Sequence, residues 1–468
     1  MEILKTKDSA AASKGIMDFR TFVNMNKDRL DNNSFLSFAF PINNLNLISI
    51  LNSVNKKYKD VLFYRKAQDN YSFIAINRLI ELPSDNSNLF NFTPVITEIN
   101  SHIINNWADY NLENLPIITG GVNFDENNFS DEWDDFRVNN FFIPGLIIFQ
   151  NRDKTYIIYN HKFNIEEDIG NIFISFNQLV SSILSLNNIN NTNTTVAINK
   201  IGECKIEENS WINLISEAKG YLKNDLNKIV LSRRIQYKVN DEINWTNCMQ
   251  KLDSDYQECY LYMIKSKGTI FFGASPEKFI SAQNKRIDLD AMAGSAPGNS
   301  QDIETALMNN KNLKEHKFVT DFIENTLLMY SDEIIAMKNP TIIKLSNVQH
   351  LYTKISARLY SENKVFNLME SLFPTPAVCG LPKDKAQESI RKLEKFDRGL
   401  YSGLIGWISL EMNCEFAVAI RSALYKDEKL YIYAGAGIVE ESDPKEEFFE
   451  TELKFKTILN LFDEQKAS

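Results

Sequence analysis

Cysteine and histidine are both scarce in this sequence of 468 residues. Five cysteines occur, an odd number, and no two of them form a CxxC pair. They are Cys204, Cys248, Cys259, Cys379 and Cys414. Neither a disulfide framework nor a cysteine zinc site is indicated, so we expect reduced thiols in a cytoplasm. Only four histidines occur, and a histidine-based zinc site is equally poorly supported.

Long apolar runs and an excess of positive charge are also missing. No stretch approaches the roughly 20 apolar residues that span a membrane, and the first residues lack the apolar core of a signal peptide. The formal net charge is -10, whereas nucleic-acid binding needs concentrated lysine and arginine. The hydrophobic fraction of 44% is that of a folded globular protein. We therefore expect a cytoplasmic enzyme, monomeric by default, that binds neither membrane nor nucleic acid.

The character of the chain changes near residue 195. Before it, short β-like runs such as "VLFYR" and "GLIIFQ" alternate with asparagine-rich connections, and "NNINNTNTT" (187–195) is the most linker-like stretch. After it, strand-like and helical patterns follow one another more densely. Strands adjacent in sequence, with long helices between groups of them, predict an α+β fold in which helices pack on antiparallel sheets.

Three helices are expected in the second part. One begins at a cap formed by Ser210, and another runs from about Asp302 to Tyr330. The last begins at Pro444, behind a cap at Asp443 or Ser442, and runs to about Phe462; Glu446 is placed for a capping box.

Two residues at strand ends are candidates for acid–base chemistry. In "KIVLSRR", period-two alternation sends Lys228 and Val230 to one face of a strand and Ile229 to the other. A lysine there is usually a solvated end residue, but a buried one can take a proton from water. In "FFGASPEKF", Glu277 follows a turn; it is either an exposed carboxylate or a buried one able to give a proton to a leaving group.

Carboxylates at helical spacing form a second group of candidates. In "KEHKFVTDFI" only one of the neighbours Glu315 and His316 can face a given pocket. In "DPKEEFFETELK", the residues Glu447, Glu450 and Lys454 share one stripe. Carboxylates on one stripe suit a hard cation such as Mg2+, and they equally suit a surface ion pair between the last two residues.

Taken together and in order, these stretches resemble the chorismate-utilising enzymes, and within that family the isochorismate synthases. The resemblance covers about residues 210–461 and does not clearly extend over the first 190. The matching stretches are "KIVLSRR", "FFGASPEKF", "LDAMAGSAPG", "KEHKFVTDFI", "VQHLYTKI", "LFPTPAVCGLPKDKA", "FDRGLYSGLIGW", "FAVAIRSA" and "YAGAGIVEESDPKEEFFETELK".

The resemblance implies a layered α/β fold of two large antiparallel β-sheets with helices outside and an active site in a cleft between the sheets. Residues 196–468 would be the chorismate-binding catalytic region, and residues 1–195 a divergent part that completes the same fold. The implied activity is the reversible, Mg2+-dependent conversion of chorismate to isochorismate. Water adds at C2 of the ring while the C4 hydroxyl leaves.

The resemblance also assigns roles by motif position. Lys228 would be the base that activates water, and Glu277 the acid that protonates the departing hydroxyl. The metal would be held by Glu315 and Glu450, with Glu447 in support. Substrate would be bound by Gly294, Ser295, His350, Ala377, Val378, Tyr401, Arg421, Gly435, Gly437 and Lys454.

Differences within the family favour an isochorismate synthase. Anthranilate synthases have glutamine where Lys228 stands, and aminodeoxychorismate synthases have lysine where Ala293 stands. Salicylate synthases usually have Thr-Ala-Ser where this chain reads "PAVCG". A salicylate synthase, which goes on to eliminate pyruvate, and a non-catalytic chorismate-binding relative are the alternatives. The sequence leaves open whether the product feeds menaquinone or siderophore synthesis.

Two positions depart from the family pattern. Asn312 replaces a frequent acidic residue three positions before Glu315, which could alter the surroundings of the metal ligands. Gly298 replaces a frequent arginine, and the sequence offers no account of its effect.

Overall fold

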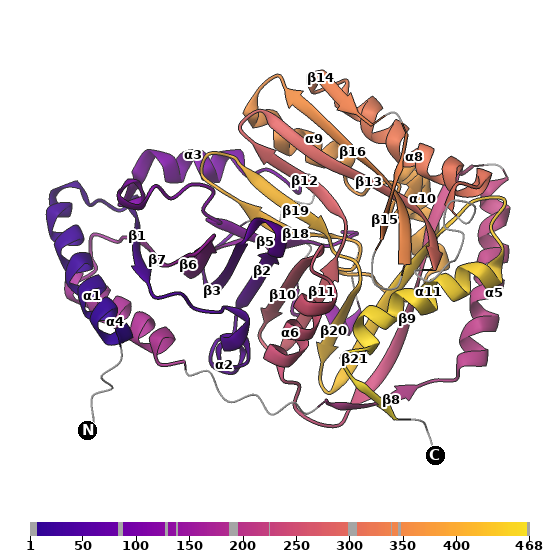
Figure 1. Cartoon of the computed structure of the whole chain (residues 1–468). Helices are drawn as coiled ribbons and strands as arrows, with labels where there is room; N and C mark the ends of the chain where they lie inside the picture. Colours follow the sequence, from indigo (N-terminus) through magenta and orange to yellow (C-terminus); the bar gives the residue numbers. More distant parts are fainter. Residues whose placement is uncertain are drawn as a thin grey trace.

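The computed structural model describes residues 7–82, 88–126, 130–136, 139–186, 195–223, 225–297, 307–337, 339–344 and 348–465. The strands form two large sheets with helices on their outer faces, and the first helix α1 and the last helix α11 lie on opposite sides of the molecule (Figure 1). Pairing is antiparallel except for the short contacts of β1 with β4 and of β22 with β8. The predicted α+β fold with two antiparallel sheets is therefore confirmed.

The first sheet contains strands from both parts of the sequence. Its neighbours in order are β22 (Asp463–Gln465), β8 (Ala197–Ile201), β9 (Lys228–Val239), β21 (Lys429–Ile438), β20 (Ser422–Lys426), β11 (Thr269–Ser275), β10 (Tyr260–Ser266), β2 (Val61–Lys66), β3 (Tyr71–Glu81), β6 (Phe142–Asn151), β7 (Lys154–Lys162), β1 (Phe35–Ile42) and β4 (Ile103–Asn105). The short strand β17 (Gly380–Leu381) pairs with the start of β9.

The second sheet begins beside the first, where β5 meets β6 at a single residue pair. Its neighbours in order are β5 (Ile118–Val122), β18 (Leu404–Ile408), β19 (Cys414–Val418), β12 (Lys278–Gln283), β13 (Arg286–Pro297) and β16 (Val348–Leu359). Both β14 (Ser331–Ala336) and β15 (Thr341–Lys344) pair with the far side of β16. Strands on the two sides of residue 195 pair directly, β2 with β10 and β5 with β18.

The helices cover three regions of the sheets (Figure 1). The outer face of the first sheet packs against α1 (Lys7–Met25), α2 (Leu51–Lys57), α4 (Ile169–Leu184) and α6 (Trp245–Asp255). The core between the sheets also contacts α3 (Thr93–His102), α8 (Asn310–Leu327) and α9 (Val365–Leu372). Around β9 lie α5 (Cys204–Leu222), α10 (Lys383–Leu393) and α11 (Pro444–Leu459). Short 3-10 helices are Lys27–Arg29, Ile48–Ile50, Ala67–Asp69, Trp107–Tyr110, Asp131–Trp133 and Glu362–Lys364.

The first sheet is buried on both faces, which explains the continuous apolar runs in its strands. On β2, Leu62 and Tyr64 point into the core between the sheets, while Val61 and Phe63 point into the core under α2 and α6. Successive side chains of a strand face opposite ways, so a strand between two cores needs apolar residues at every position.

The predicted start of the last helix, α11, agrees with the structure, whereas the predicted start of α5 does not. The Asp443 carboxylate accepts hydrogen bonds from the backbone N–H groups of Lys445 and Glu446, so Asp443 is the cap of α11. The predicted cap at Ser210 is wrong, because α5 begins six residues earlier at Cys204. Glu207 accepts hydrogen bonds from Lys200 and Arg233, and these bonds tie down the turns before Ser210.

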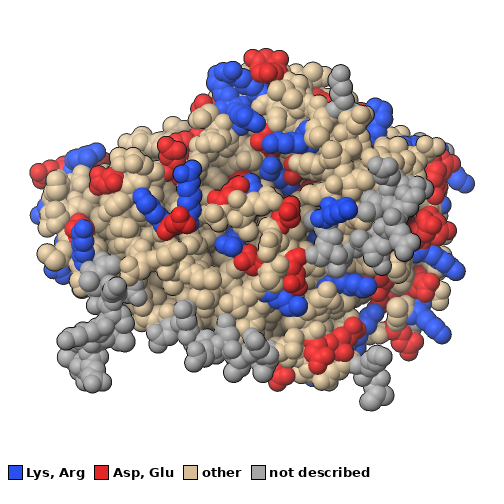
Figure 2. All heavy atoms as spheres, in the orientation of Figure 1, with Lys and Arg blue, Asp and Glu red and all other residues tan. Residues whose placement is uncertain are grey.

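The helix predicted from about Asp302 to Tyr330 is found in part. Its described portion is α8, which Asn309 caps by accepting a hydrogen bond from the backbone N–H of Asn312. The predicted start at Asp302, the position of Gly298 and nearly all of the linker-like stretch lie outside the described residues. In the part of the chain that is described, no helix is long and apolar enough to cross a membrane. On the face shown in Figure 2, acidic and basic side chains are interspersed.

Candidate active site

Two connections carry the chain from one sheet to the other, and they lie side by side. The first joins β11 to β12 and contains Glu277; the second joins β19 to β20 and contains Arg421. The backbone N–H of Val418 donates to the carbonyl oxygen of Glu277 at 3.0 Å and holds the two connections together. Residues far apart in sequence thus meet at the junction of the sheets.

A cavity at this junction collects the residues that the sequence singled out. Its walls include Glu277, Glu315, Glu450 and all ten residues assigned to substrate binding. Of the predicted site residues, only Lys228 and Glu447 are absent from the wall. Lys228 pairs with Glu315 of the wall, and Glu447 pairs with Lys311. The free volume is about 70 Å³. Sites that enclose a small molecule usually have roughly 300 Å³ or more, so side chains would have to move to admit a ligand.

Lys228 is fully buried at the start of β9. Its face of the strand is the predicted one: Val230 lines the cavity, while Ile229 and Leu231 pack against the helices behind the sheet. The Lys228 Nζ lies 3.1 Å from Glu315 Oε1 but makes no aligned hydrogen bond to a described residue. A buried amine without an aligned hydrogen-bond partner can bind a water molecule.

Glu277 is 5% exposed, and its backbone N–H donates to the Ser275 hydroxyl at 3.2 Å. Burial raises the pKa of the Glu277 carboxyl to about 8, and the charge of Asp290 adds to the effect; Lys228, Lys454 and Arg421 oppose it. A carboxyl with such a pKa carries its proton at neutral pH. Glu277 can therefore act as a proton donor, as a general acid must.

Arg421, His350 and Ser295 form a hydrogen-bonded chain. Arg421 Nη2 lies 2.9 Å from His350 Nε2, and His350 Nδ1 lies 3.1 Å from the Ser295 hydroxyl. Burial lowers the pKa of His350 to about 3, with the Arg421 charge adding to the effect, so the imidazole is neutral. Because Arg421 can only donate, His350 Nε2 accepts and Nδ1 carries the hydrogen. Arg421 has a φ of +52°, a strained backbone found often at functional sites.

Two glycines let the backbone approach the cavity closely. Gly294 has a φ of +77°, which a residue with a side chain adopts only with strain, and a β-carbon there would lie 3.1 Å from Asn312 Cβ. A β-carbon at Gly437 would overlap the Glu315 carboxylate. Asn312 thus packs against the Gly294 turn as well as standing one turn from Glu315 on α8.

Each of the three predicted metal ligands faces a lysine. Glu315 pairs with Lys228, Glu450 with Lys454 at 2.6 Å, and Glu447 with Lys311. Burial raises the pKa of Glu447, as does the charge of Glu450, and Lys311 opposes both. Burial acts in the same direction on Glu450, but Lys454 outweighs it, and the net pKa of Glu450 is lowered.

The surroundings of Lys311 show whether a cation suits this place. Burial lowers the pKa of Lys311, but the charges of Glu447, Glu450 and Glu315 help to raise it above its ordinary value, so all three carboxylates act on one ammonium group. Carboxylate oxygens are the ligands that Mg2+ prefers, and the set fits such an ion. Among the described residues, no three His, Cys, Asp or Glu side chains are already arranged around a metal position. The carboxylates would have to turn from their lysines toward the ion.

Comparison with known proteins agrees with this geometry. The family model described as "Chorismate binding enzyme" matches residues 21–463. The chain belongs to this family. The match begins well before residue 210, so the relationship reaches into the part where the motifs were not recognisable.

Individual relatives cover nearly the whole chain. An isochorismate synthase MenF of Bacillus subtilis is 28% identical over 440 residues, which are 91% of this chain and 93% of the relative. A salicylate biosynthesis isochorismate synthase of Pseudomonas aeruginosa is 26% identical over 445 residues, 92% of this chain and 90% of the relative. The solved structure of Escherichia coli MenF has a TM-score of 0.76 at 21% identity, covering 95% of this chain and 99% of that one. The similarity to the Escherichia coli structure, at 21% identity, shows a common fold.

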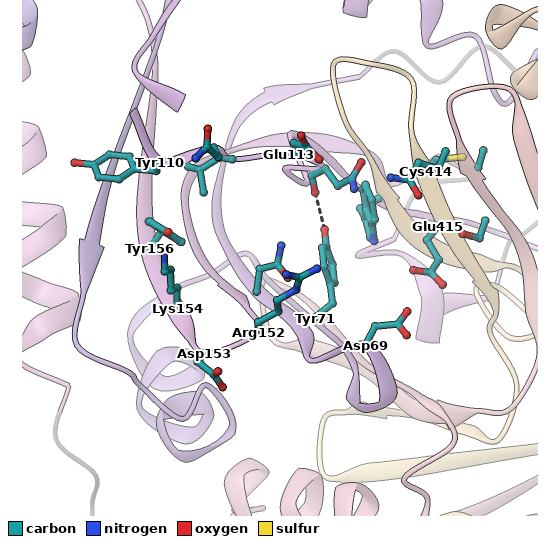
Figure 3. A pocket seen from close by; sticks show the side chains of 18 residues that line it. Asp69, Tyr71, Tyr110, Glu113, Arg152, Asp153, Lys154, Tyr156, Cys414 and Glu415 are labelled. Carbon is teal, nitrogen blue, oxygen red and sulfur yellow. Dashed lines mark hydrogen bonds between the residues drawn. The ribbon is translucent and has the colours of Figure 1, made fainter. Parts of the chain in front are cut away.

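A larger cavity of this chorismate-binding protein, of about 710 Å³, lies away from the sheet junction. Figure 3 shows Tyr110 and Tyr156 on one side of it and Cys414 and Glu415 on the other. Glu415 already accepts hydrogen bonds from Lys66 at 2.6 Å and from the Tyr260 hydroxyl at 2.8 Å. Its carboxylate is thus engaged within the protein. Glu277 and Arg421, in contrast, line the smaller cavity, and the buried amine of Lys228 pairs with Glu315 in its wall. The smaller cavity is the candidate active site.

Sequence reasoning missed a buried ion pair behind the site. Arg398 and Glu394 pair at 2.6 Å with side chains 2% exposed. Arg398 also donates to the carbonyl oxygens of Val230 and Val378, both of which line the cavity. The spacing of four residues was visible in "EKFDR", but nothing in the sequence shows that the pair is buried.

Proposed function

We propose that the protein is an isochorismate synthase, which interconverts chorismate and isochorismate. The observation that carries the proposal is a buried carboxyl, Glu277, whose pKa is raised to about 8, in the wall of a cavity where Glu315 pairs with the fully buried Lys228. The family membership and the names of the relatives that match nearly the whole chain support it.

The cavity suits a dicarboxylate substrate. Arg421 supplies a guanidinium, and Lys454 supplies an ammonium that also donates to the Gly435 carbonyl oxygen at 2.7 Å. We assign them to the enolpyruvyl carboxylate, together with the Tyr401 hydroxyl and the backbone at Gly435 and Gly437. The Gly294 turn, with Ser295, would receive the ring carboxylate. Charged and backbone donors of this kind recognise carboxylates strongly.

The acid and the base divide the chemistry between them. Lys228 takes a proton from the water that adds at C2, and Glu277 gives its proton to the C4 hydroxyl as this group leaves. The reverse reaction uses the same two groups with their roles exchanged. His350, neutral and held by Arg421, contributes a wall of the cavity and no charge.

Glu315, Glu450 and Glu447 would hold Mg2+. When bound, the ion would neutralise the ring carboxylate and so reconcile an anionic substrate with an acidic wall. The protein's own contribution is to present these carboxylates on α8 and α11, within reach of the Gly294 turn.

The test is to incubate the purified protein with chorismate and Mg2+ and to separate the products by chromatography. Isochorismate is the expected product. Salicylate together with pyruvate would identify a salicylate synthase instead, and no product with fully folded protein would overturn the proposal. A Lys228→Gln preparation, carried through the same purification, controls for a contaminating enzyme.

A further inference from the structure

Asp290 is a nearly buried carboxylate behind the cavity, on β13, and it takes no part in the chemistry described above. Its side chain is 9% exposed. The Tyr352 hydroxyl donates to Oδ1 at 3.0 Å, and the Lys278 ammonium lies 3.8 Å from the same oxygen. The other oxygen, Oδ2, accepts from the backbone N–H of Lys278 at 3.4 Å.

This last contact ties Asp290 to the proton donor. Lys278 is the residue after Glu277, so Asp290 holds the peptide on one side of the acid. Val418 donates to the carbonyl oxygen of that same peptide, and the Ser275 hydroxyl accepts from the Glu277 N–H on the other side of the acid. The register of β12 against β19 shifts directly after Lys278, so regular sheet pairing does not fix this segment. The hydrogen bond from the Lys278 N–H to the Asp290 side chain restrains the backbone where regular strand pairing is interrupted.

We propose that Asp290 is a positioning residue for Glu277: it anchors the connection that carries the acid and adds a carboxylate to its surroundings. The inference deepens the proposed function, on which its catalytic meaning rests.

The charges around the acid agree with this role. The charges that chiefly act on the Glu277 carboxyl are one anion, Asp290 on β13, and three cations: Lys228 on β9, Lys454 on α11 and Arg421 before β20. The cations favour ionisation of Glu277, so after burial Asp290 is the main influence in the opposite direction.

Asp290 itself stands among groups that favour its charged form. Burial raises the pKa of Asp290 above its ordinary value, and Lys278, the Tyr352 hydroxyl, the Lys278 backbone N–H and Lys66 limit this rise. Those contacts come from β12, β16 and β2, so three strands help to keep a charge next to the acid.

The experiment is an infrared titration of the whole protein without substrate. The carbonyl stretch of protonated Glu277 is identified as the band that Glu277→Gln removes, and its midpoint is followed with pH. In Asp290→Asn, which keeps the size and an acceptor oxygen, the midpoint should fall by about one pH unit. Asp290→Glu restores the charge and should return the midpoint toward the wild-type value.

Asp288→Asn is the matched control. Asp288 lies two residues away on the same strand and bonds to the Ser356 hydroxyl, but it is not among the charges that chiefly act on Glu277. This variant should titrate like the wild type. If Asp290→Asn does not fold, Asp290→Ser, a smaller residue with an acceptor oxygen, replaces it.

A wild-type midpoint in the folded Asp290 variant would overturn the inference. An equal fall in Asp288→Asn would overturn it as well, because the effect would then be one of general charge. The titration needs no chorismate. The inference about Asp290 can therefore be overturned while the enzyme assay supports the proposed function, and the proposed function can be overturned while the titration supports the inference. In an active enzyme, the basic limb of the kcat/KM profile should move with the midpoint, whereas a merely structural role would lower the rate equally at every pH.

Discussion

The guanidinium of Arg421 donates to Nε2 of His350 across 2.9 Å, although both side chains are buried and both are candidates for substrate contact. Only a neutral imidazole can accept this bond, and the low pKa of His350 keeps it neutral. The bond fixes the ring and also holds the arginine in place. His350 therefore orients the group that we assign to the enolpyruvyl carboxylate.

Replacing Arg421 by lysine should weaken substrate binding more than it slows the chemical step. An ammonium keeps the charge but not the planar set of donors that can bond His350 and a carboxylate together. We expect KM for chorismate to rise about 10- to 100-fold, with a smaller change in kcat. Steady-state kinetics will measure both. Arg391→Lys, at an exposed pair with Asp125, is the control and should leave both constants unchanged.

The proton on Glu277 should set an upper pH limit for activity and also a pH dependence of stability. With a pKa of about 8, the acid loses its proton above that pH, and kcat/KM should fall tenfold per unit there. In the unfolded chain the pKa returns to its ordinary value near 4.5, so stability is lost as pH rises from about 4.5 to about 8.

Glu277→Gln removes both the proton donor and this loss of stability at high pH. Turnover should fall at least about 1,000-fold, while the variant should gain stability over wild type at pH 9, by at most roughly 5 kcal/mol. Urea denaturation at pH 5 and pH 9 will show the difference. Equal stability of the two proteins at both pH values would contradict the assignment of a buried, protonated carboxyl.

Local patterns in the sequence predicted several features of the site. The alternation in "KIVLSRR" predicted that Lys228 shares a face with Val230 and not with Ile229, because a strand has a fixed period of two. The rule that helix neighbours diverge is also met: Glu315 faces the cavity, while His316 bonds to the Thr353 hydroxyl. Both conclusions need only the geometry of one element.

Contacts between elements could not be read in the same way. Glu277 and Arg421 meet because two connections cross between the sheets together, and no local pattern encodes a crossing. Lys311 stands one helical turn before Glu315, a spacing typical of a solvated pair, yet its partner is Glu447 on another helix. The helix start at Cys204 depends on bonds from Glu207 to other elements, which Ser210 as a local cap signal could not reveal.

The buried pair of Lys228 and Glu315 makes the role of the lysine separable from its structural effect. Lys228→Gln should abolish turnover, by at least about 1,000-fold, and should also destabilise the fold by roughly 3 kcal/mol, since the buried Glu315 loses the amine that lies 3.1 Å from it. Adding Glu315→Gln should recover most of the stability but none of the activity. Thermal unfolding and chorismate turnover of the two single variants and the double variant will test this. Turnover in Lys228→Gln at the wild-type rate would remove the lysine from its role as base.

Magnesium should stabilise the protein through the carboxylates of α8 and α11, and chelation should stop the reaction. Saturating Mg2+ should raise the melting temperature by a few degrees, as any ligand specific for the folded state does. Glu450→Gln should lose this shift. Glu446→Gln removes an exposed carboxylate from the same helix and should keep the shift. An identical response of both variants would place the ion elsewhere.

The ion pair of Arg398 and Glu394 should support the cavity from behind without touching substrate. Arg398→Met removes the donors to Val230 and Val378 and leaves Glu394 buried without its cation, although that carboxylate still accepts from the Ser232 backbone. We expect a loss of roughly 3–5 kcal/mol in the free energy of unfolding, as for other broken buried pairs. Replacing both residues, as Glu394→Gln with Arg398→Met, should cost less than the single change because no charge stays buried alone. Urea denaturation of the single and double variants gives the coupling energy directly, and additive effects would show that the pair does not act as a unit.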